Sequence, residues 1–150
     1  MISRIAEVLD VGISELFAAA DEDAAAPVVM VVDDERIMLE GALSVIRKAM
    51  PKAKTVGFTN PAEALAFCKE EKVSLVFLDI VMGNISGLDI CREILGINPK
   101  TNVFYLTAYP EYSLDAWKTG ACGFMVKPIA EPELREQLAL LRYPIGGALR

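Results

Sequence analysis

Short, continuous apolar runs alternate with amphipathic stretches along most of the chain. Five such runs occupy residues 28–32, 55–58, 75–78, 103–106 and 123–126. Strands buried on both faces read as unbroken hydrophobic runs, and parallel strands need long, usually helical, crossovers between them. The pattern therefore predicts an α/β fold in which a parallel sheet is covered by helices on both faces.

The stretches between and after these runs predict five helices. In the first, at about 35–49, Leu39, Leu43 and Ile46 share one face. The second begins at Asn60-Pro61, since Asn can cap a helix and Pro suits its first position. The others are expected at about 88–95, at about 111–119 and from Pro132 onward, the last with an apolar face that extends to Leu141, and a loop is expected from 80 to 87.

Residues 1–26 differ in composition from the rest of the chain. They hold one cation and six acids, a charge of −5 out of the net −6. The Ala-rich acidic stretch that ends at Pro27 predicts a linker, and Ile2, Ile5 and Leu9 at helical spacing predict a short helical arm before it. We therefore expect an arm and linker at 1–26, one domain at 27–142 and a C-terminal tail at 143–150.

Composition narrows the function classes. A chain of 150 residues that is 53% hydrophobic suits a single globular domain, and no apolar run approaches the ~18 residues of a membrane span. The net charge of −6 without a basic patch argues against direct DNA binding, and the absence of histidine excludes any histidine base or ligand within the chain. Three cysteines without CxxC pairing indicate buried thiols in a reducing cytoplasm, with no export.

Polar side chains directly follow four of the five predicted strands. They are Asp33 and Asp34, Asp79, Thr107, and Lys127. Ligands of open parallel sheets bind at the carboxyl ends of the strands, where these side chains would converge. Carboxylates crowded together need a cation, and Mg²⁺ prefers oxygen ligands and accompanies phosphoryl groups. The arrangement predicts phosphoryl transfer onto Asp79, with Lys127 neutralising charge on the transferring oxygens.

Each of these residues also has a purely structural interpretation. Asp34 could cap the following helix, Thr107 could be an ordinary strand residue, and Lys127 a solvated surface charge. Their joint placement at strand ends favours the functional interpretation.

The same residues resemble the receiver domain of two-component response regulators. The resemblance covers about residues 28–142 and rests on Asp33-Asp34, Leu78-Asp79-Ile80, Thr107-Ala108 and the stretch from Gly120 to Pro128. It implies a flavodoxin-like (βα)5 doubly wound sheet with strand order 2-1-3-4-5. It further implies a signalling switch that accepts a phosphoryl group on Asp79 from a histidine kinase or phosphotransfer protein.

The resemblance also implies a Mg²⁺ site and a pairing for the lysine. Asp33, Asp34 and Asp79 would bind the ion together with the backbone carbonyl of Val81. Lys127 would pair with the acceptor Asp79 and contact the phosphoryl group.

The remaining roles implied by the resemblance concern the conformational switch and the lifetime of the phosphoryl group. Thr107 would donate to the phosphoryl oxygens and, with Phe124, form the switch. The peptide bond before Pro128 is a candidate for the cis form. Val81 and Tyr109 would flank the path of attacking water and so tune the lifetime of the phosphoryl group.

The chain departs from the receiver pattern in two places. Gly83 stands where the family usually has proline, which predicts a more mobile loop. Residues 2–17 more weakly resemble the last two helices of a lambda-repressor-like helix-turn-helix domain, but the recognition helix is missing, so DNA binding by this chain is not expected. Expected partners are the phosphodonor, a downstream protein or output domain in transcription regulation, and a second copy in a homodimer.

Two alternatives of other classes stay open. A haloacid-dehalogenase-like phosphohydrolase also uses a nucleophilic Asp with Mg²⁺, but it expects a second Asp where Val81 stands. A protein-binding adaptor that is never phosphorylated would ignore Mg²⁺. We favour the phosphorylated switch, which autodephosphorylates at most and is not a turnover enzyme.

Overall fold

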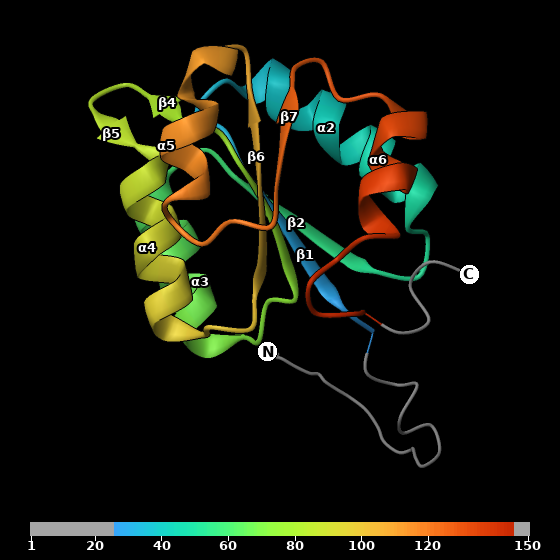
Figure 1. The fold of residues 1–150 in the computed structure, drawn as a ribbon. Helices are drawn as coiled ribbons and strands as arrows, with labels where there is room; N and C mark the ends of the chain where they lie inside the picture. The colour runs from blue at the N-terminus through green and yellow to red at the C-terminus, as the bar shows by residue number, and fades with distance from the viewer. Residues whose placement is uncertain (1–25, 146–150) are drawn as a thin grey trace.

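The computed structural model describes residues 26–145, which form a parallel sheet between two layers of helices (Figure 1). The sheet has five strands in the order β2-β1-β3-β6-β7. These are β1 (Val28–Val32), β2 (Lys54–Phe58), β3 (Leu75–Leu78), β6 (Asn102–Thr107) and β7 (Gly123–Val126). Counted within the sheet alone, this is the predicted order 2-1-3-4-5.

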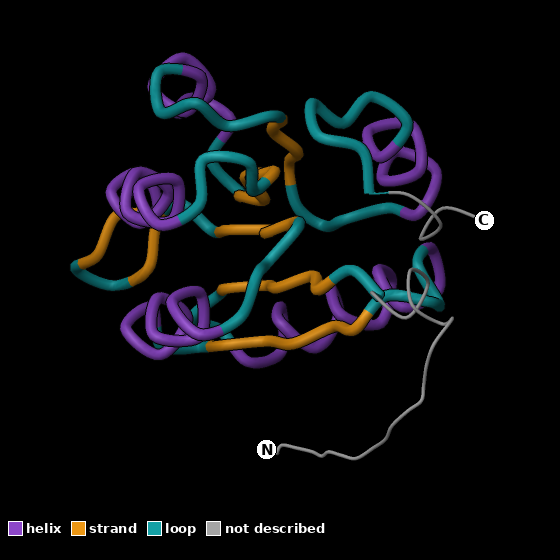
Figure 2. Tube along the Cα trace, turned by 90° about the horizontal axis from the view of Figure 1, so that it is seen from below, coloured by secondary structure: helices purple, strands orange, loops and turns teal. Residues whose placement is uncertain are grey.

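Helices cover both faces of the sheet, as Figures 1 and 2 show. One face packs against α2 (Arg36–Ala49) and α6 (Glu131–Leu138), and the other against α3 (Pro61–Glu70), α4 (Gly87–Ile97) and α5 (Ser113–Trp117). Successive strand residues point to opposite faces, so Val29 and Val31 join the first cluster while Met30 and Val32 join the second. Burial on both sides explains why the strands read as continuous apolar runs.

The start of α3 carries the predicted capping residue, and the start of α4 carries one that was not predicted. Asn60 accepts a hydrogen bond from the backbone N–H of Ala62 at 2.8 Å, with Pro61 at the first helical position. Ser86 likewise accepts from the N–H of Leu88 at 3.1 Å at the start of α4. These bonds satisfy N–H groups that a helix leaves unpaired in its first turn.

Three segments differ from the prediction. The expected loop at 80–87 contains a hairpin of β4 (Val81–Met82) and β5 (Ile85–Ser86), which Gly83 allows by turning at a φ of +59°. The helix expected at 111–119 is a 3₁₀ turn, η1 (Pro110–Tyr112), followed by the five residues of α5. The last helix ends at Leu138, so Leu141 packs on the core from beyond it.

The segment after α6 is fastened to the start of β6. The Asn102 side chain accepts from the backbone N–H of Tyr143 at 3.0 Å and donates to its carbonyl at 2.8 Å. Arg142 donates to the carbonyls of Gly120 and Ala121 at 3.1 and 3.3 Å. Residues 142–143 are thereby fixed at the amino end of the sheet.

Some predictions fall outside the described residues. The helical arm, its helix-turn-helix resemblance and nearly all of the linker lie within residues 1–25, and the end of the tail lies within 146–150. Across residues 26–145, none of the helices combines the length and the apolar character that a membrane span requires.

Candidate functional site

The strands bring the predicted polar residues to one edge of the sheet. Asp33 directly follows β1, Asp79 follows β3, Thr107 ends β6 and Lys127 follows β7. Their parallel registers align these ends, since Val32 pairs with Leu78, and Thr107 with Val126. The site predicted from the sequence is therefore assembled.

Three carboxylates form the centre of this site. One oxygen each of Asp33, Asp34 and Asp79 lies within 4.8 Å of the others. Asp33 and Asp79 are buried, whereas Asp34 is exposed at the rim. An all-oxygen donor set that is partly open to water suits a hard divalent cation such as Mg²⁺, which keeps several of its own waters.

Lys127 connects the two buried carboxylates. Its Nζ lies 2.6 Å from Asp33 Oδ2 and 3.1 Å from Asp79 Oδ2. The lysine was predicted to pair with Asp79, and the structure adds a shorter contact to Asp33. Three carboxylates against one ammonium leave a formal charge of −2, which equals the charge that one divalent cation would neutralise.

The environment opposes ionisation of Asp79. Burial raises the pKa of Asp79, and the charge of Asp33 acts in the same direction. The charge and hydrogen bond of Lys127 and a backbone hydrogen bond from Val81 lower the pKa but do not cancel the effect of burial. An additional cation beside Asp79 would therefore favour its charged, nucleophilic form.

The environment stabilises the charge of Lys127. Burial alone would lower the pKa of Lys127, but the hydrogen bond to Asp33, the charges of Asp79 and Asp33, and the hydrogen bond to Asp79 together raise it. The ammonium is therefore held charged between the two carboxylates, where it can contact an incoming anion.

Asp33 also shapes the start of α2. Its Oδ1 accepts a hydrogen bond from the backbone N–H of Glu35 at 2.9 Å, while Oδ2 binds Lys127. The capping role considered for Asp34 is not seen. Within residues 26–145 no side chain caps α2 at its N-cap residue Glu35, and Asp33 bonds the N–H of Glu35 itself. The Asp34 carboxylate remains exposed beside the other two.

The two predicted switch residues lie on neighbouring strands. Thr107 is fully buried, and its Oγ accepts from the backbone N–H of Tyr109 at 3.1 Å. Phe124 is half-buried on β7, beside β6, and packs against the cluster under α4 and α5. The Lys127–Pro128 peptide bond is cis, as predicted.

A pocket of about 260 Å³ opens over the carboxylates. Asp34, Asp79 and Lys127 line it, as do Val81 and Tyr109, the two residues predicted to tune the lifetime of the phosphoryl group. Its lining also includes Glu35 and Met38, which sequence reasoning missed because the first turn of α2 carries no motif. The one signal for these two residues is their distance along the chain, since both follow the Asp33-Asp34 pair within about one helical turn and therefore lie near it.

Gly87 is a further residue that sequence reasoning missed. Its N–H donates to the carbonyl of Ile80 at 2.6 Å, so the first residue of α4 lies directly against the backbone of Asp79 and Ile80. A Cβ atom at Gly87 would overlap the carbonyl oxygen of Asp79. The close approach holds the segment after Asp79 against the helix start.

Comparison with known proteins agrees with this geometry. The family model for the response regulator receiver domain matches residues 29–139. The positive alginate biosynthesis regulatory protein of Pseudomonas aeruginosa is 32% identical over 116 residues, which cover 73% of this chain and 45% of that protein. The transcriptional regulatory protein BtsR of Salmonella typhi is 33% identical over 115 residues, covering 76% of this chain and 47% of that protein.

Solved structures show the same fold. The response regulator TrrA from Thermotoga maritima, crystallised in complex with Mg²⁺-BeF, is 30% identical with a TM-score of 0.67. The match covers 75% of this chain and 96% of that chain. The present chain spans about half the length of the curated relatives named above. With the matching residues and the strand-end carboxylates in agreement, the chain belongs to the response regulator receiver domain family and is a signalling switch.

Proposed function

We propose that this receiver is switched by a phosphoryl group accepted on Asp79 with the help of Mg²⁺. The observation that carries the proposal is the cluster of three carboxylates, two of which are bridged by the buried side chain of Lys127. Its net charge and oxygen donors fit a divalent cation, and Asp79 faces an open pocket that admits a phosphodonor.

Each residue has a defined task in this reaction. A carboxylate oxygen of Asp79 attacks phosphorus, and the bond from phosphorus to the donor's histidine nitrogen breaks, returning that electron pair to the imidazole. Lys127 and the hydroxyl of Thr107 bind the phosphoryl oxygens, while Asp33, Asp34, Asp79 and the Val81 carbonyl hold the ion. Bound Mg²⁺ supplies positive charge against the transferring oxygens.

Magnesium is expected to stabilise the folded chain. At one hundred times its dissociation constant, Mg²⁺ should raise the free energy of unfolding by about 2.7 kcal/mol. Asp34→Asn should weaken this response while leaving the stability without Mg²⁺ nearly unchanged, because Asp34 is exposed. Urea unfolding with and without MgCl₂ measures both effects.

The matched control is Asp89→Asn, which neutralises an exposed carboxylate on α4. It should respond to Mg²⁺ like the wild type. A Mg²⁺ effect that is equal in all three proteins would contradict the proposed ligand set. No effect in the wild type, with no response to beryllofluoride, would favour the adaptor alternative.

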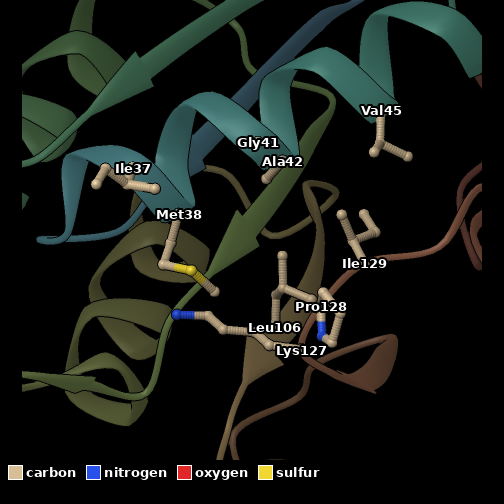
Figure 3. A pocket seen from close by; sticks show the side chains of 9 residues that line it. All are labelled: Ile37, Met38, Gly41, Ala42, Val45, Leu106, Lys127, Pro128 and Ile129. Atoms are coloured by element: carbon tan, nitrogen blue, oxygen red, sulfur yellow. The ribbon is translucent and has the colours of Figure 1, made fainter.

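The phosphodonor is proposed to dock on an apolar groove beside the site. This groove of about 270 Å³ runs between α2 and the segment after β7, lined by Ile37, Ala42, Val45, Leu106 and Ile129 among others (Figure 3). Met38 and Lys127 line both this groove and the pocket over Asp79, so the two surfaces are continuous. A histidine kinase or phosphotransfer protein must contact this rim to bring its histidine to Asp79.

Ile37→Asp tests the docking surface. The Ile37 side chain is 85% exposed, so the change should not destabilise the fold. It should slow phosphotransfer from a kinase that labels the wild type by about tenfold, since a charge would have to be buried in an apolar contact. Rates measured with radiolabelled kinase would show this.

Labelling by acetyl phosphate separates docking from chemistry. This small donor does not need the groove, so Ile37→Asp should be labelled at the wild-type rate. Leu140→Asp, at another exposed apolar residue beyond α6, should be normal with both donors. Equal slowing with both donors would place Ile37 in the acceptor site instead.

Downstream events are proposed on the other side of the site. Thr107 turns toward the phosphoryl group, Phe124 moves inward, and the surface of α5 and β7 changes its affinity for a downstream protein, an output domain or a second copy. The phosphoryl group is lost by slow hydrolysis without turnover of a substrate. Free cysteines at positions 68, 91 and 122 fit a cytoplasmic setting, and no direct contact with DNA is proposed.

A further inference from the structure

The short helix α5 has little apolar attachment to the sheet. Ala116 is its only buried residue, while Leu114 and Trp117 are 75% and 52% exposed. Helices of this length are not stable by themselves and depend on tertiary contacts. Another interaction must therefore hold α5 in place.

A buried chain of hydrogen bonds joins α5 to β6. The Tyr105 hydroxyl on β6 lies 2.7 Å from Thr119 Oγ1, which in turn donates to the carbonyl of Ala116 at 2.6 Å. A hydroxyl carries one proton, so Tyr105 must be the donor to Thr119. Burial raises the pKa of Tyr105, which keeps this proton in place. The thiol of Cys91 adds a contact to the Thr119 carbonyl at 3.9 Å.

This relay lies directly behind the switch residues. Tyr105 precedes Thr107 by two positions on β6, so both face α5, and Tyr105 pairs in register with Phe124. Thr107 Oγ accepts from the N–H of Tyr109. The segment from 108 to 119 is thus attached to β6 near its N-terminal end by Thr107 and at its C-terminal end by Tyr105.

We infer that the relay from Tyr105 through Thr119 to Ala116 is a fixed pivot for α5. The inference rests on the proposed function. When Thr107 turns to the phosphoryl group, its bond with the N–H of Tyr109 is released, whereas the bond between Tyr105 and Thr119 stays. Breaking the relay would leave a buried phenol hydroxyl unpaired, which is costly, so the bond persists in both states. The helix then turns about Thr119 instead of detaching.

Tyr105→Phe tests the pivot, because it removes the hydroxyl and keeps the ring. Amide hydrogen exchange at residues 113–119 should accelerate about fivefold, as expected for one lost hydrogen bond, while α2 exchanges as before. Affinity for beryllofluoride with Mg²⁺ should stay within about twofold of wild type, because a bond present in both states contributes no coupling. The Trp117 fluorescence change on adding beryllofluoride should shrink, since α5 is no longer held in one orientation.

Tyr112→Phe is the matched control, because the Tyr112 hydroxyl makes no hydrogen bond within residues 26–145. It should leave exchange and fluorescence unchanged. Thr119→Val provides a second variant, which should also accelerate exchange at 113–119.

Two results would overturn the inference. Wild-type exchange at 113–119 in both relay variants would show that the relay does not hold α5. Beryllofluoride binding that tightens about tenfold in Tyr105→Phe would show that the bond between Tyr105 and Thr119 breaks on activation. The bond would then stabilise only the inactive state and could not be a fixed pivot. Failure of the proposed function is distinguishable, because wild type would then ignore beryllofluoride while the exchange difference at α5 remained.

Discussion

Asp79→Asn is expected to abolish covalent phosphorylation of the chain. An amide oxygen is a far weaker nucleophile than a carboxylate, and the change also removes one negative ligand from the cation site. Stability should not suffer, because the raised pKa of Asp79 shows that its charged form is disfavoured by burial and the amide has the same shape. Lys127 keeps its shorter contact, to Asp33.

The mass of the intact protein after incubation with acetyl phosphate and Mg²⁺ measures this effect. Wild type should gain one phosphoryl group, which hydroxylamine should remove as it does other acyl phosphates. Asp89→Asn should be labelled like wild type, since Asp89 lies on the exposed face of α4. A labelled Asp79→Asn protein would mean that another side chain accepts the phosphoryl group.

Gly87→Ala is expected to cause the largest loss of stability among glycine-to-alanine changes within residues 26–145. The new Cβ would overlap the Asp79 carbonyl oxygen, and the nearest atoms all belong to the backbone of Asp79 and Ile80, so no flexible side chain can yield. Overpacking of this kind costs about 1–3 kcal/mol or more, which urea unfolding would measure. Because relief requires moving Asp79, Mg²⁺ affinity should fall by at least about tenfold, or 1.4 kcal/mol.

Gly96→Ala is the matched control within the same helix. Nothing lies within 4 Å of a Cβ built at Gly96, so alanine meets no obstacle there. Alanine is favoured over glycine in helices, and stability should stay the same or rise by about 0.5–1 kcal/mol. If both variants behaved alike, the close approach of α4 to Asp79 would have no energetic importance.

The sequence predicts the sheet and the central site well, for a physical reason. Strands buried on both faces produce unbroken apolar runs, so the bounds of β1, β3 and β7 were predicted to the residue. Parallel strands end together at one edge, so polar residues that follow them must meet. Asp33, Asp79, Thr107 and Lys127 were therefore placed correctly without any knowledge of distances.

Features that depend on packing distances were not predictable. Nothing in the local pattern shows that Gly87 lies against the Asp79 carbonyl or that Lys127 approaches Asp33 more closely than Asp79. The early end of α5 at Trp117 was also not predictable. The hydrogen bond between Tyr105 and Thr119, just beyond this end, joins residues that meet only in the fold.

The two hydrogen bonds between the Asn102 side chain and the Tyr143 backbone fix the point where the described chain leaves the sheet. This point lies at the opposite end of β6 from Thr107, about 17 Å away at the rise of a strand. Arg142 donates hydrogen bonds to the carbonyls of Gly120 and Ala121, which directly follow the relay residue Thr119. Residues 142 and 143 are thus attached next to Thr119, the proposed pivot, so the described chain should keep its exit point from the sheet while α5 turns.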